Sequence, residues 1–353
     1  MKVGTLTLPP ALEAKLPFFR TTRRTLGGIS GGRTSALMHV LTLAANGPDA
    51  PYIGLFSNTG REHPATLDFL RDLEAATERP LVWTEFVPPP VWGQAPRYAR
   101  VREVTYDTAS RDGTPFVDFL ETLAQFRRQQ KDLPPTAPGH KHRLCTAYLK
   151  IRTMHRWALS QGFEDYDKFV GLRADEPDRV STLASHDRGG VAHFTPLSRA
   201  GLTKADVLAF WAAQPFDLQI PEHLGNCTAC FLKDEADLAQ VLYEEPIADA
   251  AWWIRVQEAY GSFRRSRRSY AEVLAEAPVR LEVVRPALAR GETPVCPEGF
   301  SPRRFLLITR QEQRRLRTPS TGFSCACEGA QLAEDDGLEA TLARPELDEG
   351  ASS

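Results

Sequence analysis

A pair of glycines between an expected strand and an expected helix places the tightest constraint on this chain. Residues 25–29 have the composition of a strand, Ser30-Gly31-Gly32-Arg33-Thr34-Ser35 follows, and residues 36–41 are apolar and helix-like. Glycine allows a tight turn and close approach of the backbone to a ligand, while the N–H groups at a helix start bind anions. The stretch predicts a phosphate-binding turn; taken alone, a plain glycine turn is the alternative interpretation.

Strands and helices alternate through the first half of the chain. We expect strands at 25–29, 52–56, 81–86 and 169–172, and helices from residue 64, at 116–131, at 148–160 and at 207–213, the last behind a capping box at 203–206. This order predicts an α/β fold, a Rossmann-like doubly wound parallel sheet. Ligands of such sheets bind at the carboxyl ends of the strands, where the turns at Gly31-Gly32 and at Gly60 fall.

The chain divides into four expected parts. Residues 1–23 are an N-terminal extension, 24–235 the strand–helix domain, 236–330 a helical and loop extension, and 331–353 an acidic tail with seven carboxylates against one arginine. The net charge of the whole chain is −2, so the rest of it carries about +4. The composition of the tail is typical of disorder.

Two runs of arginines lie in the helical and loop extension. One run is Arg264, Arg265, Arg267 and Arg268, and the other is Arg303, Arg304, Arg310, Arg314, Arg315 and Arg317. Solvated helix faces are the simpler interpretation, and nucleic-acid contact is the alternative. No apolar run is long enough to span a membrane and no signal peptide is apparent, so we expect a cytoplasmic protein with no membrane partner.

Six cysteines are arranged more like metal ligands than like a disulfide framework. Cys227-Thr-Ala-Cys230 is one clip, Cys145 lies in a basic stretch, and Cys325-Ala-Cys327 stands near the C-terminus. Zn²⁺ or an iron–sulfur cluster needs about four ligands. A fourth ligand would come from Cys296, Cys325 or Cys327, although Cys296 also fits as a small buried apolar residue. Cys327 or Cys325 is preferred, because a segment crossing back over the metal would explain why the chain extends past the sheet.

Two further segments supply polar groups at expected strand ends. Asn58-Thr59-Gly60 follows the second strand, and it is interpreted either as an ordinary turn or as a nucleotide contact. Arg173 and Arg179 flank three acids after the strand at 169–172. Guanidinium groups bind phosphate or sulfate through paired hydrogen bonds, and a salt-bridged surface loop is the alternative.

These segments together resemble, in order, the phosphoadenosine phosphosulfate (PAPS) reductase family of the PP-loop ATP pyrophosphatases. The family's phosphate loop is matched by 30–35, its NTG element by 56–60, the helix start that follows by 63–69 and its cysteine-lysine segment by 145–150. Its arginine loop is matched by 170–179, its Pro-Leu and Trp segments by 194–211, and its cysteine clip by 225–230. The resemblance runs from about residue 24 to about residue 235.

The resemblance implies an adenine nucleotide alpha-hydrolase-like fold. It implies nucleotide contacts from Ser30, Gly31, Gly32, Arg33, Thr34, Ser35, Asn58, Thr59, Gly60, Arg173 and Arg179, and a [4Fe–4S] cluster on Cys145, Cys227, Cys230 and a fourth cysteine. Thr146 stands where many members have a second cysteine, and the family's C-terminal reductase motif is absent. These departures resemble the sulfur-transfer subgroup that includes the DNA phosphorothioation protein DndC.

That subgroup implies an enzyme that cleaves ATP, with Mg²⁺, between the α- and β-phosphates. It adenylates an oxygen, releases pyrophosphate and lets sulfur displace AMP. Nucleic acid is the implied acceptor, and a sulfur-donor or accessory protein an implied partner. Two alternatives remain: a PAPS or adenylyl sulfate reductase, whose redox thiol would be Cys296, Cys325 or Cys327, and a non-catalytic nucleotide or nucleic-acid binding module with structural metal.

Overall fold

The computed structural model describes residues 1–139, 142–184, 190–221, 224–263 and 268–317. They form two compact units, one of residues 1–134 and 143–220 and the other of the remaining described residues. Cys145 therefore belongs to the first unit, and Cys227 and Cys230 belong to the second. The acidic tail at 331–353, Cys325 and Cys327 lie outside the described residues.

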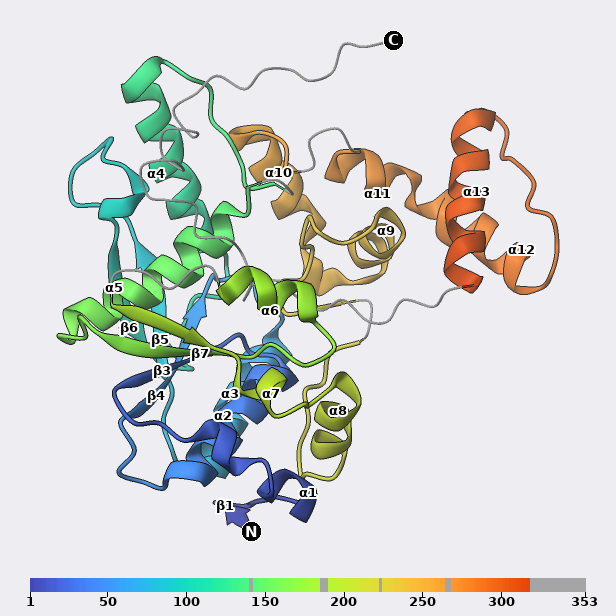
Figure 1. Ribbon diagram of the computed structural model, residues 1–353. Coiled ribbons are helices and arrows are strands. Elements are labelled where there is room, and N and C mark those ends of the chain that lie inside the picture. The colour runs from blue at the N-terminus through green and yellow to red at the C-terminus, as the bar shows by residue number, and fades with distance from the viewer. Residues whose placement is uncertain (140–141, 185–189, 222–223, 264–267, 318–353) are drawn as a thin grey trace. The chain divides into compact units, whose positions relative to one another are not determined.

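A six-stranded sheet runs through the first unit (Figure 1), in the order β6-β5-β4-β3-β7-β8. The strands are β3 (Thr25–Ile29), β4 (Tyr52–Asn58), β5 (Val82–Val87), β6 (Arg100–Val104), β7 (Tyr166–Val170) and β8 (Val191–Phe194). Every neighbouring pair is parallel except β5 and β6. The predicted α/β fold is confirmed, and the expectation of a wholly parallel sheet is wrong at this edge.

The antiparallel edge follows from the connection between β5 and β6. Residues 88–99 begin with three prolines and contain only the short 3₁₀ turn η2 (Pro96–Tyr98). A parallel neighbour is usually reached through a crossover helix, and this segment has none. The chain therefore returns alongside β5 in the opposite direction.

Helices cover both faces of this sheet, and Figure 1 shows α2 (Arg33–Asn46) and α3 (Pro64–Thr77) on one side and α5 (Arg152–Ser160) on the other. Ile29 and Phe56 lie in the core cluster of α2 and α3, to which α8 (Lys204–Ala212) also contributes. Leu26 and Leu55 lie in a second cluster with Trp157 of α5. Side chains that alternate along a strand thus fill two separate layers.

The remaining elements of the first unit are mostly short. They are β1 (Lys2–Val3), β2 (Leu6–Thr7), α1 (Pro10–Glu13), η1 (Leu16–Phe19), α4 (Thr114–Lys131), α6 (Pro177–Ala184) and α7 (Pro196–Arg199). The predicted capping box is confirmed, because the hydroxyl and backbone N–H of Thr203 both donate to Asp206 at the start of α8.

The helix expected from residue 148 begins earlier and is wound differently. Its first turns are the π-helix η3 (Cys145–Ile151), which runs directly into α5. The Thr153 hydroxyl donates to the carbonyl of Tyr148, 2.8 Å away, at this junction. π-Helical turns are rare and occur frequently at functional sites.

The described part of the second unit is helical, as the sequence predicts after residue 236. Its elements are α9 (Glu235–Glu244), η4 (Pro246–Ala248), α10 (Ala250–Tyr260), α11 (Tyr270–Pro278), the π-helix η5 (Val279–Val284), α12 (Arg285–Ala289) and α13 (Pro302–Arg317). Trp253, Phe263 and Tyr270 pack ring to ring in its core. Beside α13, the buried Arg280 donates to the buried Glu312 at 2.8 Å.

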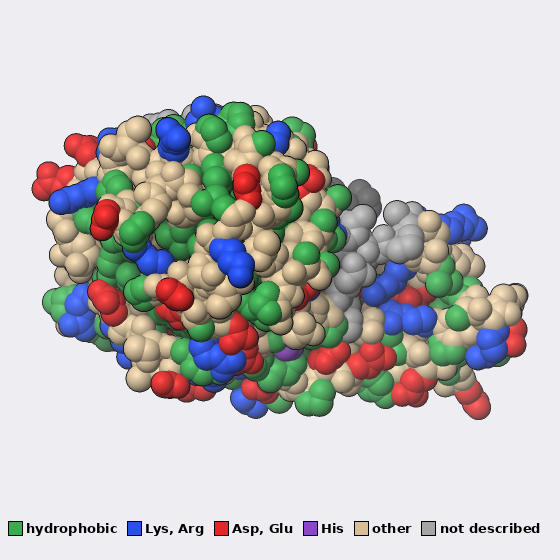
Figure 2. Space-filling view, turned by 90° about the horizontal axis from the view of Figure 1, so that it is seen from below, with side chains coloured by type: hydrophobic (Ala, Val, Ile, Leu, Met, Phe, Trp, Pro, Cys, Tyr) green, Lys and Arg blue, Asp and Glu red, His purple; other side chains and the backbone are tan. Residues whose placement is uncertain are grey.

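The surface drawn in Figure 2 carries basic, acidic and apolar side chains interspersed over one face, without a large region of a single sign. Among the described helices, none combines the length and the apolar character needed to cross a lipid bilayer.

Candidate functional site

The turn after β3 is closed by its own serines. The Ser35 hydroxyl accepts from the Ser30 backbone N–H at 3.0 Å, lies 3.0 Å from the Ser30 hydroxyl and donates to the Gly32 carbonyl. Gly31 has a φ of +80°, and a Cβ there would lie 2.3 Å from the Thr66 methyl carbon. Only glycine fits this position without displacement, so the expected glycine turn has a structural cause. The turn opens onto the start of α2, where backbone N–H groups favour an anion.

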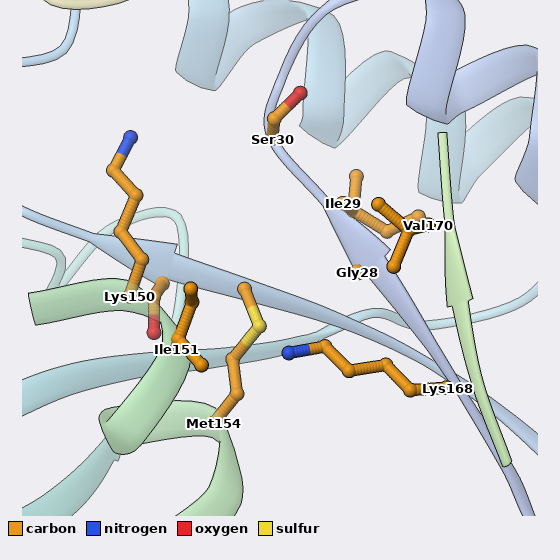
Figure 3. Close-up of a pocket in the computed structure, with 9 residues that line it drawn as sticks. Gly28, Ile29, Ser30, Lys150, Ile151, Met154, Lys168 and Val170 are labelled. Atoms are coloured by element: carbon orange, nitrogen blue, oxygen red, sulfur yellow. The ribbon is translucent and has the colours of Figure 1, made fainter. Parts of the chain in front are cut away.

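A pocket lies beside this turn, at the carboxyl ends of three neighbouring strands (Figure 3). Its lining residues are Gly28, Ile29 and Ser30 of β3 and its turn, Ser57 of β4, Lys150 and Ile151 of η3, Met154 of α5, and Lys168 and Val170 of β7. β3 lies between β4 and β7, which the chain reaches in opposite directions along the sheet. Such a switch point is where open α/β sheets bind ligands.

Two lysines bring positive charge to this pocket. Lys168 projects from β7, and Figure 3 shows its side chain reaching across toward Met154. The Lys150 ammonium lies 3.6 Å from the buried carboxylate of Glu62, which also accepts from the backbone N–H and hydroxyl of Thr59. This ion pair and Lys168 place two basic side chains at the pocket, one of them with a carboxylate partner.

Arg173 reaches the glycine turn from a distant part of the chain. Its guanidinium donates to the Thr34 hydroxyl at 3.2 Å and lies 3.2 Å from Glu176. The Arg173 guanidinium also donates to the carboxylate of Asp175. Partial burial of Asp175 raises its pKa, but the hydrogen bond and the positive charge of Arg173 outweigh this and hold the pKa of Asp175 below its ordinary value. The loop of Arg173 and the glycine turn thus meet, and nucleotide binding by Arg173 stays a prediction.

The other two candidate arginines are engaged by carboxylates. Arg179, in the first turn of α6, pairs with Glu176, which in turn pairs with Arg173. Arg179 is thus linked to the glycine turn only through Glu176 and Arg173. The Arg33 guanidinium makes two hydrogen bonds to Asp217 and a third to the Leu218 carbonyl. Its side chain therefore fixes the segment after α8, and what Arg33 offers the turn is its backbone N–H at the start of α2.

The second turn is folded inward. The Asn58 side chain accepts from the Gly60 N–H at 3.1 Å and donates to the buried Glu85 at 2.6 Å. The Thr59 hydroxyl donates to Glu62. The Asn58 and Thr59 side chains are thus engaged by Glu85 and Glu62, and it is Ser57, one residue before Asn58, that lines the pocket.

The cysteine clip lies in a loop before α9. Cys230 is buried, Cys227 is half-buried, and the Tyr270 hydroxyl donates to the carbonyl of Ala229 between them at 2.8 Å. The fully buried Lys233 donates to the Leu224 carbonyl at 3.0 Å. Burial lowers the pKa of Lys233, while Cys230 and Cys227 act in the opposite direction. The clip thus holds two thiols three residues apart in one loop, a spacing typical of metal ligands.

Of the remaining cysteines, Cys145 lies in the first unit and Cys296 in the second, while Cys325 and Cys327 lie outside the described residues. Cys145 is half-buried at the first residue of η3. Cys296 packs with Val284, Phe305 and Ile308, consistent with a role as a small apolar residue. Within the described residues no group of three or more His, Cys, Asp or Glu side chains is arranged to hold a metal ion. Because Cys325 and Cys327 lie outside those residues, the four-cysteine hypothesis stays a prediction.

Lys168, Met154 and Glu62 are site residues that the sequence reasoning did not select. Lys168 could have been selected from the sequence, because a lysine is unusual in the middle of a largely buried central strand such as Tyr166–Val170. Glu62 had a weaker one, since an acid three residues after Thr59 can close a turn. Met154 gave none, because an apolar helical residue is ordinarily core.

Comparison with known proteins gives one relative and no family. No family model matches this sequence. The chain is 29% identical over 321 residues to the uncharacterized nin region protein ORF290 of Escherichia phage lambda, an alignment that covers 88% of this chain and 97% of that protein. The two are therefore similar along most of their lengths, and the name of the phage protein states no activity.

Proposed function

We propose that this protein is a PP-loop enzyme of the PAPS reductase type that binds ATP in the pocket of Figure 3 and cleaves it between the α- and β-phosphates. One observation carries this proposal. Lys150 and Lys168 line the pocket together with Ser30 of the glycine turn, and Arg173, from a fourth segment, donates to Thr34 of the same turn. A turn of N–H groups beside three cations suits a polyphosphate better than a neutral ligand.

In the proposed reaction an acceptor oxygen attacks the α-phosphorus, the bond to the bridging oxygen of the β-phosphate breaks, and pyrophosphate leaves. The turn at 30–35 and Arg173 would hold the departing pyrophosphate, stabilising the charge that develops on it. Mg²⁺ would be carried by phosphate oxygens and water, as is common for this ion, because Glu62 already accepts from Thr59 and faces Lys150. Sulfur would then displace AMP from the adenylated acceptor.

A [4Fe–4S] cluster belongs to the same proposal. Cys227 and Cys230 fit such a group chemically, because they are thiols three residues apart in one loop. Cys145 and either Cys327 or Cys325 would complete the set. When bound, the cluster would supply iron for sulfur chemistry or hold its ligands together. We propose nucleic acid as the acceptor, with a sulfur-donor protein as a further partner.

Pyrophosphate release from ATP by anaerobically purified protein tests the catalytic proposal. Arg173→Gln and Lys168→Gln should each weaken ATP binding by about 10- to 100-fold, the usual effect of losing a hydrogen bond to a charged group. Arg71→Gln, an exposed arginine paired with Asp72, is the matched control. Nucleotide binding without turnover would favour the binding-module alternative, and sulfite release from adenylyl sulfate would favour the reductase.

Iron and sulfide analysis of the same protein tests the cluster separately. Cys227→Ser should lose iron, whereas Cys296→Ser should keep it because its side chain packs in the apolar core near α13. Stoichiometric zinc in a colourless protein would overturn the cluster proposal and leave the ATP proposal standing.

A further inference from the structure

Helix α13 has one face that belongs to the core of the second unit. Phe305 and Ile308 are buried there, and Glu312 is 1% exposed. Arg304 pairs with Glu235 and Glu276, and Arg315 lies 2.7 Å from Asp237. These two arginines of the C-terminal run are therefore structural, because their charge is used within the unit.

The opposite face carries the other four arginines of the run, here called the arginine stripe: Arg303, Arg310, Arg314 and Arg317. All four are exposed, and none forms an ion pair with a residue that the structure describes. They are seven, four and three residues apart, so at 3.6 residues per turn they fall within about 60° of one another along about 21 Å of helix. Arg314 lies four residues after Arg310 and three residues before Arg317. Like charges at these spacings repel each other and lower the stability of a helix.

We propose that the arginine stripe of α13 binds the phosphate backbone of double-stranded DNA. A straight row of four guanidinium groups, none paired with a described carboxylate, complements a polymer whose charges repeat along its axis, and backbone contacts of this kind need no base sequence. The inference deepens the proposed function, on which it rests for the idea of a nucleic-acid acceptor. It assigns the contact to a helix outside the nucleotide-binding unit.

The burial pattern of α13 favours DNA over a membrane surface. A helix that lies on a bilayer inserts its apolar face between the lipids. In α13 that face, with Phe305 and Ile308, is already packed inside the unit. Only Leu306 and Leu307, 49% and 46% exposed, flank the stripe, which is too little apolar surface for insertion.

The test measures binding of the full-length protein to a fluorescein-labelled 30-base-pair duplex of mixed sequence by anisotropy, without ATP, at several salt concentrations. The stripe variant is Arg303→Gln, Arg310→Gln, Arg314→Gln and Arg317→Gln together. The control variant, with the same change in charge at exposed positions elsewhere, is Arg20→Gln, Arg100→Gln, Arg128→Gln and Arg290→Gln. Circular dichroism and thermal unfolding establish that both variants are folded.

The wild-type protein should bind, with affinity falling steeply as salt rises. In the stripe variant, the slope of log K against log salt concentration should be less steep by about 3.6. The factor by which affinity falls between 50 and 200 mM salt should therefore be about 150 times smaller than in the wild-type protein. The control variant should keep the wild-type slope. Equal losses in both variants, no loss in either, or binding to phosphatidylserine vesicles but not to the duplex would each overturn the inference. Pyrophosphate release by the stripe variant is assayed in parallel, so a failure of the ATP proposal is seen separately.

Discussion

Replacing Gly31 by alanine should disrupt the phosphate turn through two separable effects. The first is the backbone, because an L-residue at φ +80° costs about 1–2 kcal/mol. The second is a collision, because the new Cβ would lie 2.3 Å from the methyl carbon of Thr66, a residue of α3 that is fully buried. Overpacking of this kind costs about 1–3 kcal/mol, so Gly31→Ala should destabilise the protein by about 2–5 kcal/mol in all.

Thr66→Ser removes the methyl group that the alanine would strike. By itself this change should cost about 1 kcal/mol, the value of one buried methyl group. In the double variant the collision is relieved and only the backbone cost remains. The double variant should therefore be more stable than the sum of the single variants predicts, by about 1–3 kcal/mol.

Urea unfolding of the four proteins of this cycle measures the coupling, and ATP binding is measured in parallel. Binding should recover in the double variant less than stability does, because the strained φ remains in the turn that would hold the phosphates. Strict additivity of the two substitutions would refute the contact between Gly31 and Thr66 as the reason for glycine.

Three further predictions concern other parts of the chain. Burial lowers the pKa of His39 to about 3, with a smaller effect from Arg79, so below pH 6.5 the unfolded chain binds a proton that the folded chain does not. The free energy of unfolding, measured in urea, should therefore fall by about 1.5 kcal/mol between pH 6.5 and pH 5. This fall should be smaller in His39→Gln and unchanged in the control His142→Gln, whose histidine is exposed. Glu312→Gln removes the buried carboxylate that pairs with Arg280 and Arg285, while Glu235 still pairs with Arg280, and should cost about 1.5–3 kcal/mol by thermal unfolding; a cost under about 0.5 kcal/mol would contradict that role. Deleting residues 331–353 removes about six negative charges and should tighten duplex binding at low salt; unchanged affinity would show that the tail does not compete.

Local patterns in the sequence placed β3 and α4 closely, but β7, expected at 169–172, runs from Tyr166 to Val170. β3 has the predicted bounds, and α4 begins two residues before the predicted start, because apolar periodicity and glycine or proline boundaries are properties of short segments. The edge strand β6 was not predicted, since its exposed arginines and glutamate do not alternate as a half-buried strand does. Its pairing depends on a neighbour distant in the fold rather than on its own composition.

The candidate site was predicted in outline and not in its side-chain roles. The meeting of Thr34 with Arg173 agrees with the expectation that both serve one ligand. The sequence could not indicate that Asn58 faces Glu85, or that Arg33 is held by Asp217, because each partner is supplied by the tertiary fold. By sequence alone, a polar residue at a strand end can either face a ligand or bind a buried carboxylate.

The π-helix at Cys145–Ile151 links two parts of the proposed chemistry mechanically. It begins at Cys145 and carries Lys150 and Ile151 into the pocket. Rewinding it to an α-helix would remove one residue from the turn, which shifts the chain before it by about 1.5 Å and rotates it by about 100° relative to α5. A ligand that favours one winding therefore sets the position of the thiol as well as that of the ammonium. By thermodynamic reciprocity, ligation at Cys145 would change nucleotide affinity by the same factor by which the nucleotide changes ligation.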